Sequence, residues 1–173
     1  NLYKELLNFC TVDLSAFYFD IRKDSLYCDP VESKKRKSVI LLLNIILNSL
    51  LKWFAPILSF TTEEIYRLLF KDNKSVHLEK FLDFPDSFSN EKLNQKWIEL
   101  IKIRNICNIS IEEKRANKEI GSSLEADLNI HLDKNLEEIT KNINFSELCI
   151  TSKAAISFKE KLETSAKTTK AKG

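Results

Sequence analysis

The sequence predicts a mainly α-helical protein, in which a helical bundle is followed by a small α+β part of β-α-β order. Three observations support this fold class. The 173 residues include only two Gly and three Pro, so few turns should interrupt long helices. Apolar residues recur at helical spacing over much of the chain up to residue 120. Beyond residue 120 the pattern changes to an alternation that is typical of a half-buried strand.

These patterns divide the chain into three expected parts. Residues 1–120 are predicted to form the helical bundle, residues 121–152 a small α/β subdomain, and residues 153–173 a linker or disordered tail. The tail is predicted because Lys, Thr, Ser and Ala accumulate there, and Phe158 is its one aromatic residue. The sequence contains no Met, even at position 1, so we expect a piece of a longer protein.

Two helices are expected before the first proline. Residues 1–8 are predicted to end one helix, and residues 12–26 to form a second, because apolar side chains recur there at helical spacing. Asp29 and Pro30 should end the second helix, since the residue before a proline avoids the helical region. The apolar positions of this second helix are Leu14, Phe17, Tyr18 and Ile21.

The next predicted helix spans residues 34–54, and Ser33 can cap its first turn. It begins with four consecutive cations, residues 34–37, which oppose the helix dipole and therefore serve solubility or a polyanion. Residues 39–60 are long and apolar enough to be weighed as a membrane span. Lys52 and Pro56 interrupt them, however, so we expect a buried core helix and no membrane.

A shorter helix is expected to begin at a capping box. Residues 61–64, Thr-Thr-Glu-Glu, place a glutamate three residues after a threonine, and the helix should continue to Leu69. Residues 71–90 are then predicted to be an irregular connector, whose phenylalanines should pin it onto the bundle.

A long helix is predicted over residues 91–118 by a stripe of regularly spaced side chains. Arg104 lies on this stripe, between Leu100 and Cys107. Because arginine is rarely buried without a partner, Arg104 should either meet a carboxylate or reach the edge of a cleft. Trp97 lies on the same stripe, where a core position is the more common role of a tryptophan.

The predicted α+β part begins with a strand over residues 124–132, in which Leu, Ala and Ile alternate with polar residues. His131 falls in the polar set and is interpreted as a solvated residue. Asp133 should cap a helix that runs to about residue 142, and residues 147–151 are expected to form a second strand.

No motif of a catalytic or metal-binding site is present, so we expect no catalytic residue, no metal site and no cofactor in this chain. The cysteines form no CxxC pair and have no His at ligand spacing. Two disulfides are possible by number, but no signal peptide is evident, so free thiols in the cytoplasm are expected. These cysteines are Cys10, Cys28, Cys107 and Cys149.

What remains is a surface suited to RNA. Basic residues near the end of the second helix and along the long helix could contact phosphates, and an exposed aromatic could stack on an unpaired base. A charged, solvated face is the more common meaning of such residues. The candidate RNA-binding residues are Arg22, Lys23, Trp97, Arg104, Lys114, Arg115 and Lys118.

Four blocks, in order between residues 9 and 132, carry a resemblance to a known family. VDLSAFYFDIRKDSLYCD, residues 12–29, closely resembles the signature of the isoleucyl-tRNA synthetases. WFAPILSFTTEEIY, residues 53–66, is similar to the family's APILPFTAEEIW, with Ser59 in place of proline and Tyr66 in place of tryptophan. Residues 75–78 resemble the family's SVHL, and residues 120–126 its IGSSLEA.

The resemblance implies the anticodon-binding region of a bacterial, cytoplasmic, monomeric enzyme that charges tRNA(Ile). For the whole enzyme it implies ATP and Mg²⁺, and in many members Zn²⁺. The family's HIGH and KMSKS motifs are absent here, so the catalytic domain would lie upstream in the same polypeptide. The residues alone leave open an alternative: an autonomous helical scaffold that binds another protein through residues 39–60.

Overall fold

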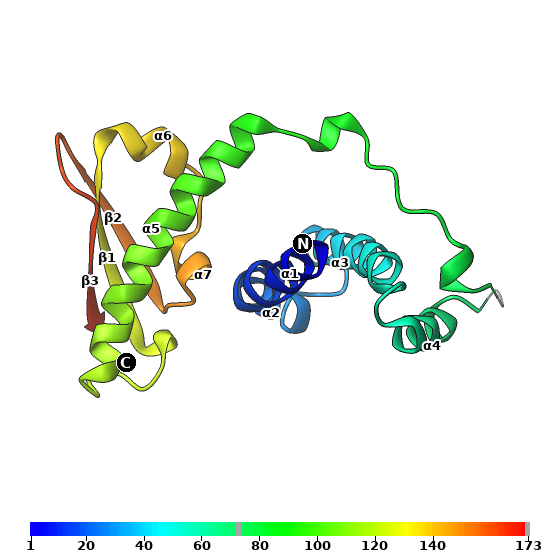
Figure 1. Cartoon of the computed structure of the whole chain (residues 1–173). Coiled ribbons are helices and arrows are strands. Elements are labelled where there is room, and N and C mark those ends of the chain that lie inside the picture. Colours follow the sequence, from blue (N-terminus) through cyan, green and yellow to red (C-terminus); the bar gives the residue numbers. More distant parts are fainter. Residues whose placement is uncertain (72–73, 172–173) are drawn as a thin grey trace. The chain divides into compact units, whose positions relative to one another are not determined.

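The computed structural model describes residues 1–71 and 74–171, and the chain divides into two compact units, Asn1–Phe88 and Ser89–Gly173. We call these the N-terminal and C-terminal units. The described part of the N-terminal unit is helical, and the C-terminal unit combines helices with a three-stranded sheet (Figure 1). The predicted fold class, mainly α with a small α+β part, is confirmed. The division itself differs from the predicted boundary after residue 120, because the long helix belongs to the unit that holds the sheet.

The N-terminal unit begins with one continuous helical run, made of α1 (Leu2–Asn8), the π-helical segment η1 (Phe9–Phe19) and α2 (Asp20–Tyr27). The prediction of two separate helices is therefore wrong. No Gly or Pro interrupts the run, and the backbone stays right-handed helical at both junctions. The Thr11 hydroxyl also donates to the Leu7 carbonyl at 2.8 Å, across the first junction.

Helix α3 (Lys34–Phe54) has the predicted bounds and the predicted cap, because the Ser33 hydroxyl accepts the Arg36 amide at 3.4 Å. Its buried residues are Val39, Ser49, Leu51 and Lys52, whereas Ile40, Leu41 and Leu42 are exposed, so α3 is less buried than the predicted core helix. Within the described residues, α3 is the one helix whose length and composition would suffice to cross a membrane, which is weak evidence because core helices meet the same criteria.

Helix α4 (Ser59–Leu69) starts two residues before the expected capping box, so that prediction is wrong. The amides of Ile57 and Leu58 bond to the Phe54 carbonyl at 2.9 and 2.7 Å, and this turn leads directly into α4. Thr62 is consequently inside the helix, where its hydroxyl donates to the Leu58 carbonyl at 3.0 Å. A small core joins α3, α4 and the connector through Leu51, Ala55, Tyr66 and Val76.

The connector between α4 and the long helix contains two short 3₁₀ turns, η2 (Val76–Leu78) and η3 (Asp86–Phe88). Its phenylalanines do not pin it onto the bundle as predicted, because Phe81 and Phe88 are each 65% exposed. Val76 holds this position instead, at 2% exposure.

The long helix is α5 (Glu91–Ala116), close to its predicted bounds, and the Asn90 side chain caps it by accepting the Leu93 amide at 3.0 Å. Its buried face packs against the sheet (Figure 1). The buried residues of α5 are Leu100, Ile103, Cys107 and Ile111.

The sheet has the order β2-β1-β3. Strand β1 (Ala126–Asp133) follows the short turn η4 (Ser123–Glu125) and shows the predicted alternation of burial. It pairs in parallel with β2 (Lys153–Lys159), with Ile130 opposite Ile156, and antiparallel with β3 (Ser165–Lys170), with Ile130 opposite Ala166. Between β1 and β2 the chain forms η5 (Lys134–Leu136), α6 (Glu137–Thr140) and α7 (Phe145–Cys149).

Two predictions for this region are wrong. Residues 147–151 do not form a strand, because the Asn144 side chain accepts the Glu147 amide and starts α7. Ile150 then leaves α7 in the left-handed conformation, at φ 56°, and β2 begins at Lys153. The predicted tail contains both β2 and β3, and its last two residues, 172–173, lie outside the described residues.

Candidate nucleic-acid interface

The two basic residues of α2 differ in their surroundings. Arg22 is half-buried and lies beside the Tyr18 ring, whereas Lys23 is exposed. Burial raises the pKa of the Tyr18 phenol, and the charge and hydrogen bond of Arg22 partly oppose this rise. Arg22 is therefore engaged with Tyr18 of the same helical run, and Lys23 is the exposed basic residue of α2.

Arg104 ties α5 to α7. Its Nε donates to the Leu148 carbonyl at 2.9 Å, a backbone partner that the sequence did not predict. Leu148 lies in the last turn of α7, where a carbonyl lacks a partner within the helix. Trp97, two turns earlier on α5, is half-buried.

Two buried thiols lie next to Arg104. Cys107 of α5 and Cys149 of α7 are hydrogen-bonded to each other, and all four cysteines are free thiols. The bond to Cys149, together with burial, raises the pKa of Cys107 far above its ordinary value. The same bond lowers the pKa of Cys149, and the nearby charge of Arg104 adds to this effect. The thiol pair and Arg104 thus form one polar seam between α5 and α7.

The basic residues at the end of α5 are interleaved with carboxylates. Lys114 Nζ lies 2.8 Å from a Glu119 oxygen, and Arg115 Nη1 lies 2.6 Å from Glu112 Oε1. Lys118 follows the helix in the left-handed conformation, at φ 57°, and is exposed. Two of these three cations are consequently paired, which lowers the positive potential that this end of α5 offers to a phosphate.

The structure also brings together residues that were not predicted from the sequence to be neighbours. Arg115, Lys118 and Lys170 line one open hollow of about 560 Å³ at the end of α5. Lys170 was missed because it lies in the predicted tail. The alternation of Ala166 and Thr168 with exposed neighbours was the available signal for a strand, but these side chains are too small to make that signal clear.

The turn after α5 is held by a glutamate of the IGSSLEA block. The Gly121 amide donates to Glu125 Oε2 at 3.1 Å. A Cβ at position 121 would lie 3.0 Å from Glu125 Oε1, so a larger residue would displace that carboxylate. Glycine therefore lets the chain close tightly beside Lys118.

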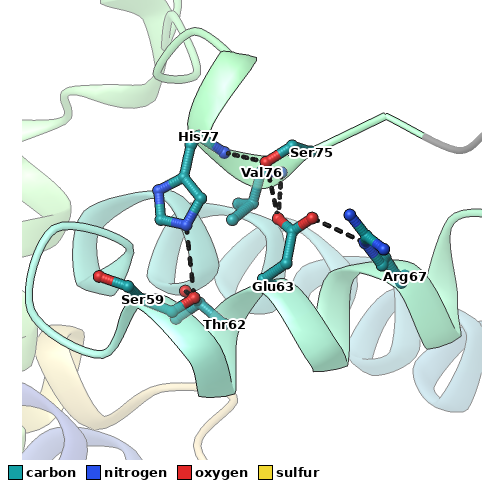
Figure 2. A network of polar contacts seen from close by, with 7 residues as sticks. All are labelled: Ser59, Thr62, Glu63, Arg67, Ser75, Val76 and His77. Atoms are coloured by element: carbon teal, nitrogen blue, oxygen red, sulfur yellow. Dashed lines mark hydrogen bonds and ion pairs between the residues drawn. The ribbon is translucent and has the colours of Figure 1, made fainter.

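In the N-terminal unit, a second glutamate fixes the SVHL block (Figure 2). Glu63 Oε2 accepts the Ser75 hydroxyl at 2.8 Å and the Val76 amide at 3.0 Å, and Oε1 accepts Arg67 Nε at 2.7 Å. Among these contacts, the Ser75 bond contributes most to lowering the pKa of Glu63 below its ordinary value of 4.5. Glu63 thus acts on the connector and not as a helix cap.

Two further contacts hold the same segment. His77 Nε2 lies 3.3 Å from the Ser59 carbonyl, a bond that requires the proton on Nε2 (Figure 2). The ammonium of Lys52, a residue only 7% exposed, lies 3.6 Å from the Glu79 carboxylate. A buried lysine needs such a partner, because an unpaired charge is costly to desolvate.

Metal-ligating side chains are not gathered anywhere in residues 1–71 and 74–171: no three His, Cys, Asp or Glu residues come together in a way that could hold an ion. The candidate interface consists of the basic and aromatic side chains of α2 and α5, together with Lys118 beyond α5 and Lys170 on β3.

Comparison with known proteins identifies the region. The family model of the anticodon-binding domain of tRNA ligase matches residues 1–131. An isoleucine–tRNA ligase of Pelagibacter ubique is 67% identical over all 173 residues, which make up 19% of that protein. Isoleucine–tRNA ligases of Bartonella henselae and Agrobacterium fabrum are each 42% identical, over 90% and 86% of this chain and 16% of their own length. The chain thus spans less than a fifth of these relatives.

Proposed function

The chain belongs to the family of anticodon-binding domains of tRNA ligases, and from this premise we propose that it is the tRNA-binding region of an isoleucine–tRNA ligase. The observation that carries the proposal is the 67% identity to such a ligase over the whole chain. Its substrate on this view is tRNA(Ile), held at the anticodon stem and loop.

The proposed contacts lie on two helices. On α2, Lys23 is exposed and free to approach a phosphate, while Arg22 reaches the surface beside Tyr18. At the end of α5, Lys118 is exposed, and Lys114 and Arg115 can exchange their glutamate partners for phosphates. Such contacts fix the position of the RNA, whereas contacts to bases supply its identity.

Trp97 and Arg104, both half-buried on α5, are the remaining residues of the proposed tRNA-binding set. Arg104 binds the Leu148 carbonyl through Nε, and the rest of its fork-shaped guanidinium carries further donors. Charging of tRNA(Ile) by a full-length enzyme with Arg104→Ala tests this role. Unchanged charging efficiency would show that Arg104 serves only the packing of α5 on α7.

Fluorescence anisotropy with a labelled anticodon stem-loop of tRNA(Ile) tests the proposed function itself. Because phosphate contacts release counterions, we expect the logarithm of the affinity to fall linearly with the logarithm of the salt concentration. Absence of binding at low salt, with a folded chain, would contradict the proposal. The alternative hypothesis, that residues 39–60 form a docking surface for another protein, would then be tested.

For the longer polypeptide we propose the activity in the relatives' names, the ligation of isoleucine to its tRNA. From the resemblance of the four sequence blocks we further propose that it uses ATP and Mg²⁺, that its catalytic domain lies upstream of this region, and that it is a cytoplasmic monomer. Within that polypeptide, we propose that this chain holds the tRNA.

A further inference from the structure

The signature run η1–α2 borders a hollow whose lining suits a nucleobase. Ser15, Phe19, Lys23 and Tyr27 recur every four residues along this run, and all of them line the hollow. Leu43 of α3 lines it as well. Its volume is about 390 Å³, within the range of about 300–1,000 Å³ that small-ligand sites occupy.

Both aromatic side chains of this hollow are exposed to solvent. Tyr27 is 81% exposed and Phe19 is 44% exposed, although both rings could gain free energy by burial. Phe19 is the last residue of the π-helical segment and Asp20 the first residue of α2, so the hollow lies where the helix changes its pitch. Segments of π-helix inside α-helices are frequent at functional sites.

We propose that this hollow binds one unpaired base of the RNA, stacked on Tyr27 and Phe19, with the adjacent phosphate on Lys23. The proposal rests on the proposed function and adds a base-binding site to it. Stacking on aromatic rings suits any base, because every base has a π-face. Asp20 also lines the hollow, and its carboxylate can accept N–H donors from the edge of the base.

The charges favour RNA over an apolar peptide as the occupant. The lining is mostly apolar and includes Leu26 as well as Leu43, but it also holds a cation and an anion, Lys23 and Asp20, which an apolar helix would leave without partners. A nucleotide uses both charges, since it has an anionic phosphate and a base edge with N–H donors.

The test uses the whole 173-residue chain and an anticodon stem-loop that carries 2-aminopurine in its loop. We expect Tyr27→Ala to weaken binding about 5- to 150-fold, the range for loss of one stacked base, without changing the salt dependence. Tyr27→Phe keeps the ring and should bind like wild type. Lys23→Gln should reduce the salt slope by about one and weaken binding of every sequence alike.

Phe81→Ala is the matched control, because Phe81 is an exposed aromatic residue of the N-terminal unit, at 65% exposure, that does not line the hollow. If wild type binds the stem-loop and Tyr27→Ala binds equally well, with the same quenching of 2-aminopurine, the base-binding site is wrong and the proposed function stands. If wild type does not bind at all, the proposed function fails and the site fails with it. Circular dichroism of each variant verifies that the helices are intact.

Discussion

On strand β1 of the C-terminal unit, the inward-facing side chains are at most 1% exposed, whereas on α4 of the N-terminal unit Phe60 is 93% exposed. The C-terminal unit closes its apolar core between α5 and the sheet. The N-terminal unit has a smaller core and adds polar contacts from the connector, namely Glu63 with Ser75 and Lys52 with Glu79. Packing changes should therefore matter most in the C-terminal unit, and polar changes should matter most in the N-terminal unit.

The chain offers a separate reporter for each unit, because its two tryptophans are Trp53 in α3 and Trp97 in α5. A chain with Trp97→Phe reports unfolding of the N-terminal unit, and one with Trp53→Phe reports the C-terminal unit. Each stability prediction below is tested by urea unfolding, followed through the fluorescence of each tryptophan reporter.

The largest expected effect is that of Leu132→Ala, at a side chain with 0% exposure. Removing it leaves a cavity between the sheet and α5 and should cost about 2–5 kcal/mol of the free energy of unfolding. The loss of stability should appear in the unfolding curve reported by Trp97 and not in the curve reported by Trp53. Leu124→Ala, at 58% exposure, is the matched control and should change stability by less than about 0.5 kcal/mol. A similar loss at both leucines would mean that the core of this unit is not closed.

The next effect is expected at the buried pair of the N-terminal unit. Glu79→Gln leaves the Lys52 ammonium without its charged partner and should cost about 1–2 kcal/mol, less than a fully buried pair because Glu79 is 27% exposed. Trp53 should report this loss. Lys52→Met removes the charge and keeps the volume, so it should be nearly neutral. If Lys52→Met proves as costly as Glu79→Gln, the ion pair itself stabilises the unit, and the desolvation argument is wrong.

A polar contact in the C-terminal unit should weigh less. Arg104→Met removes the donor to the Leu148 carbonyl and should cost about 1 kcal/mol, because water can reach a half-buried site and replace the bond. The loss should appear at Trp97. Arg115→Met removes an exposed arginine from the same helix and should cost about 0.5 kcal/mol or less. Equal losses would indicate that Arg104 does not tie α5 to α7.

The comparison also explains which elements could be predicted. Helix α3 could be predicted because apolar residues at helical spacing follow soon after its capping residue, Ser33, and strand β1 because apolar and polar residues alternate along it. Strand β3 could not, because Ala166 and Thr168 become buried only through pairing with β1, about 40 residues earlier. Residues 147–151 were mistaken for a strand because the cap at Asn144 outweighs their apolar pattern.

The same distinction holds for the candidate site. Helical spacing was expected to place Lys114 and Lys118 on one face, but α5 ends at Ala116 and Lys118 turns away in the left-handed conformation. The partner of Arg104 could not be predicted, since Leu148 lies 44 residues further along the chain. The role of Glu63 could not be predicted either, because Ser75 and Val76, its partners, follow 12 and 13 residues later in a connector without a periodic pattern. Interactions between residues close in the sequence could be predicted from it, whereas contacts between distant segments could not.

The smallest expected effect concerns Glu63 and depends on pH. The folded N-terminal unit lowers the pKa of Glu63, so the folded state binds fewer protons there than the unfolded state. Its contribution to stability is therefore complete above the unfolded pKa, near 4.5, and is lost as the pH falls through the lower, folded pKa. Glu63→Gln should be less stable than wild type at neutral pH, and this difference should vanish at acid pH.

Urea unfolding followed at Trp53, from about pH 7 down to about pH 3, measures that difference. Glu64→Gln removes the same charge from the neighbouring, exposed position of α4, so it isolates the contacts to Ser75 and Val76 from a general effect of charge. The difference in the free energy of unfolding between wild type and Glu63→Gln should change with pH. The corresponding difference between wild type and Glu64→Gln should stay nearly constant. If both differences change alike, the carboxylate acts through net charge alone, and the SVHL block is held by the burial of Val76 rather than by Glu63. The N-terminal unit would then depend on its apolar core just as the C-terminal unit does.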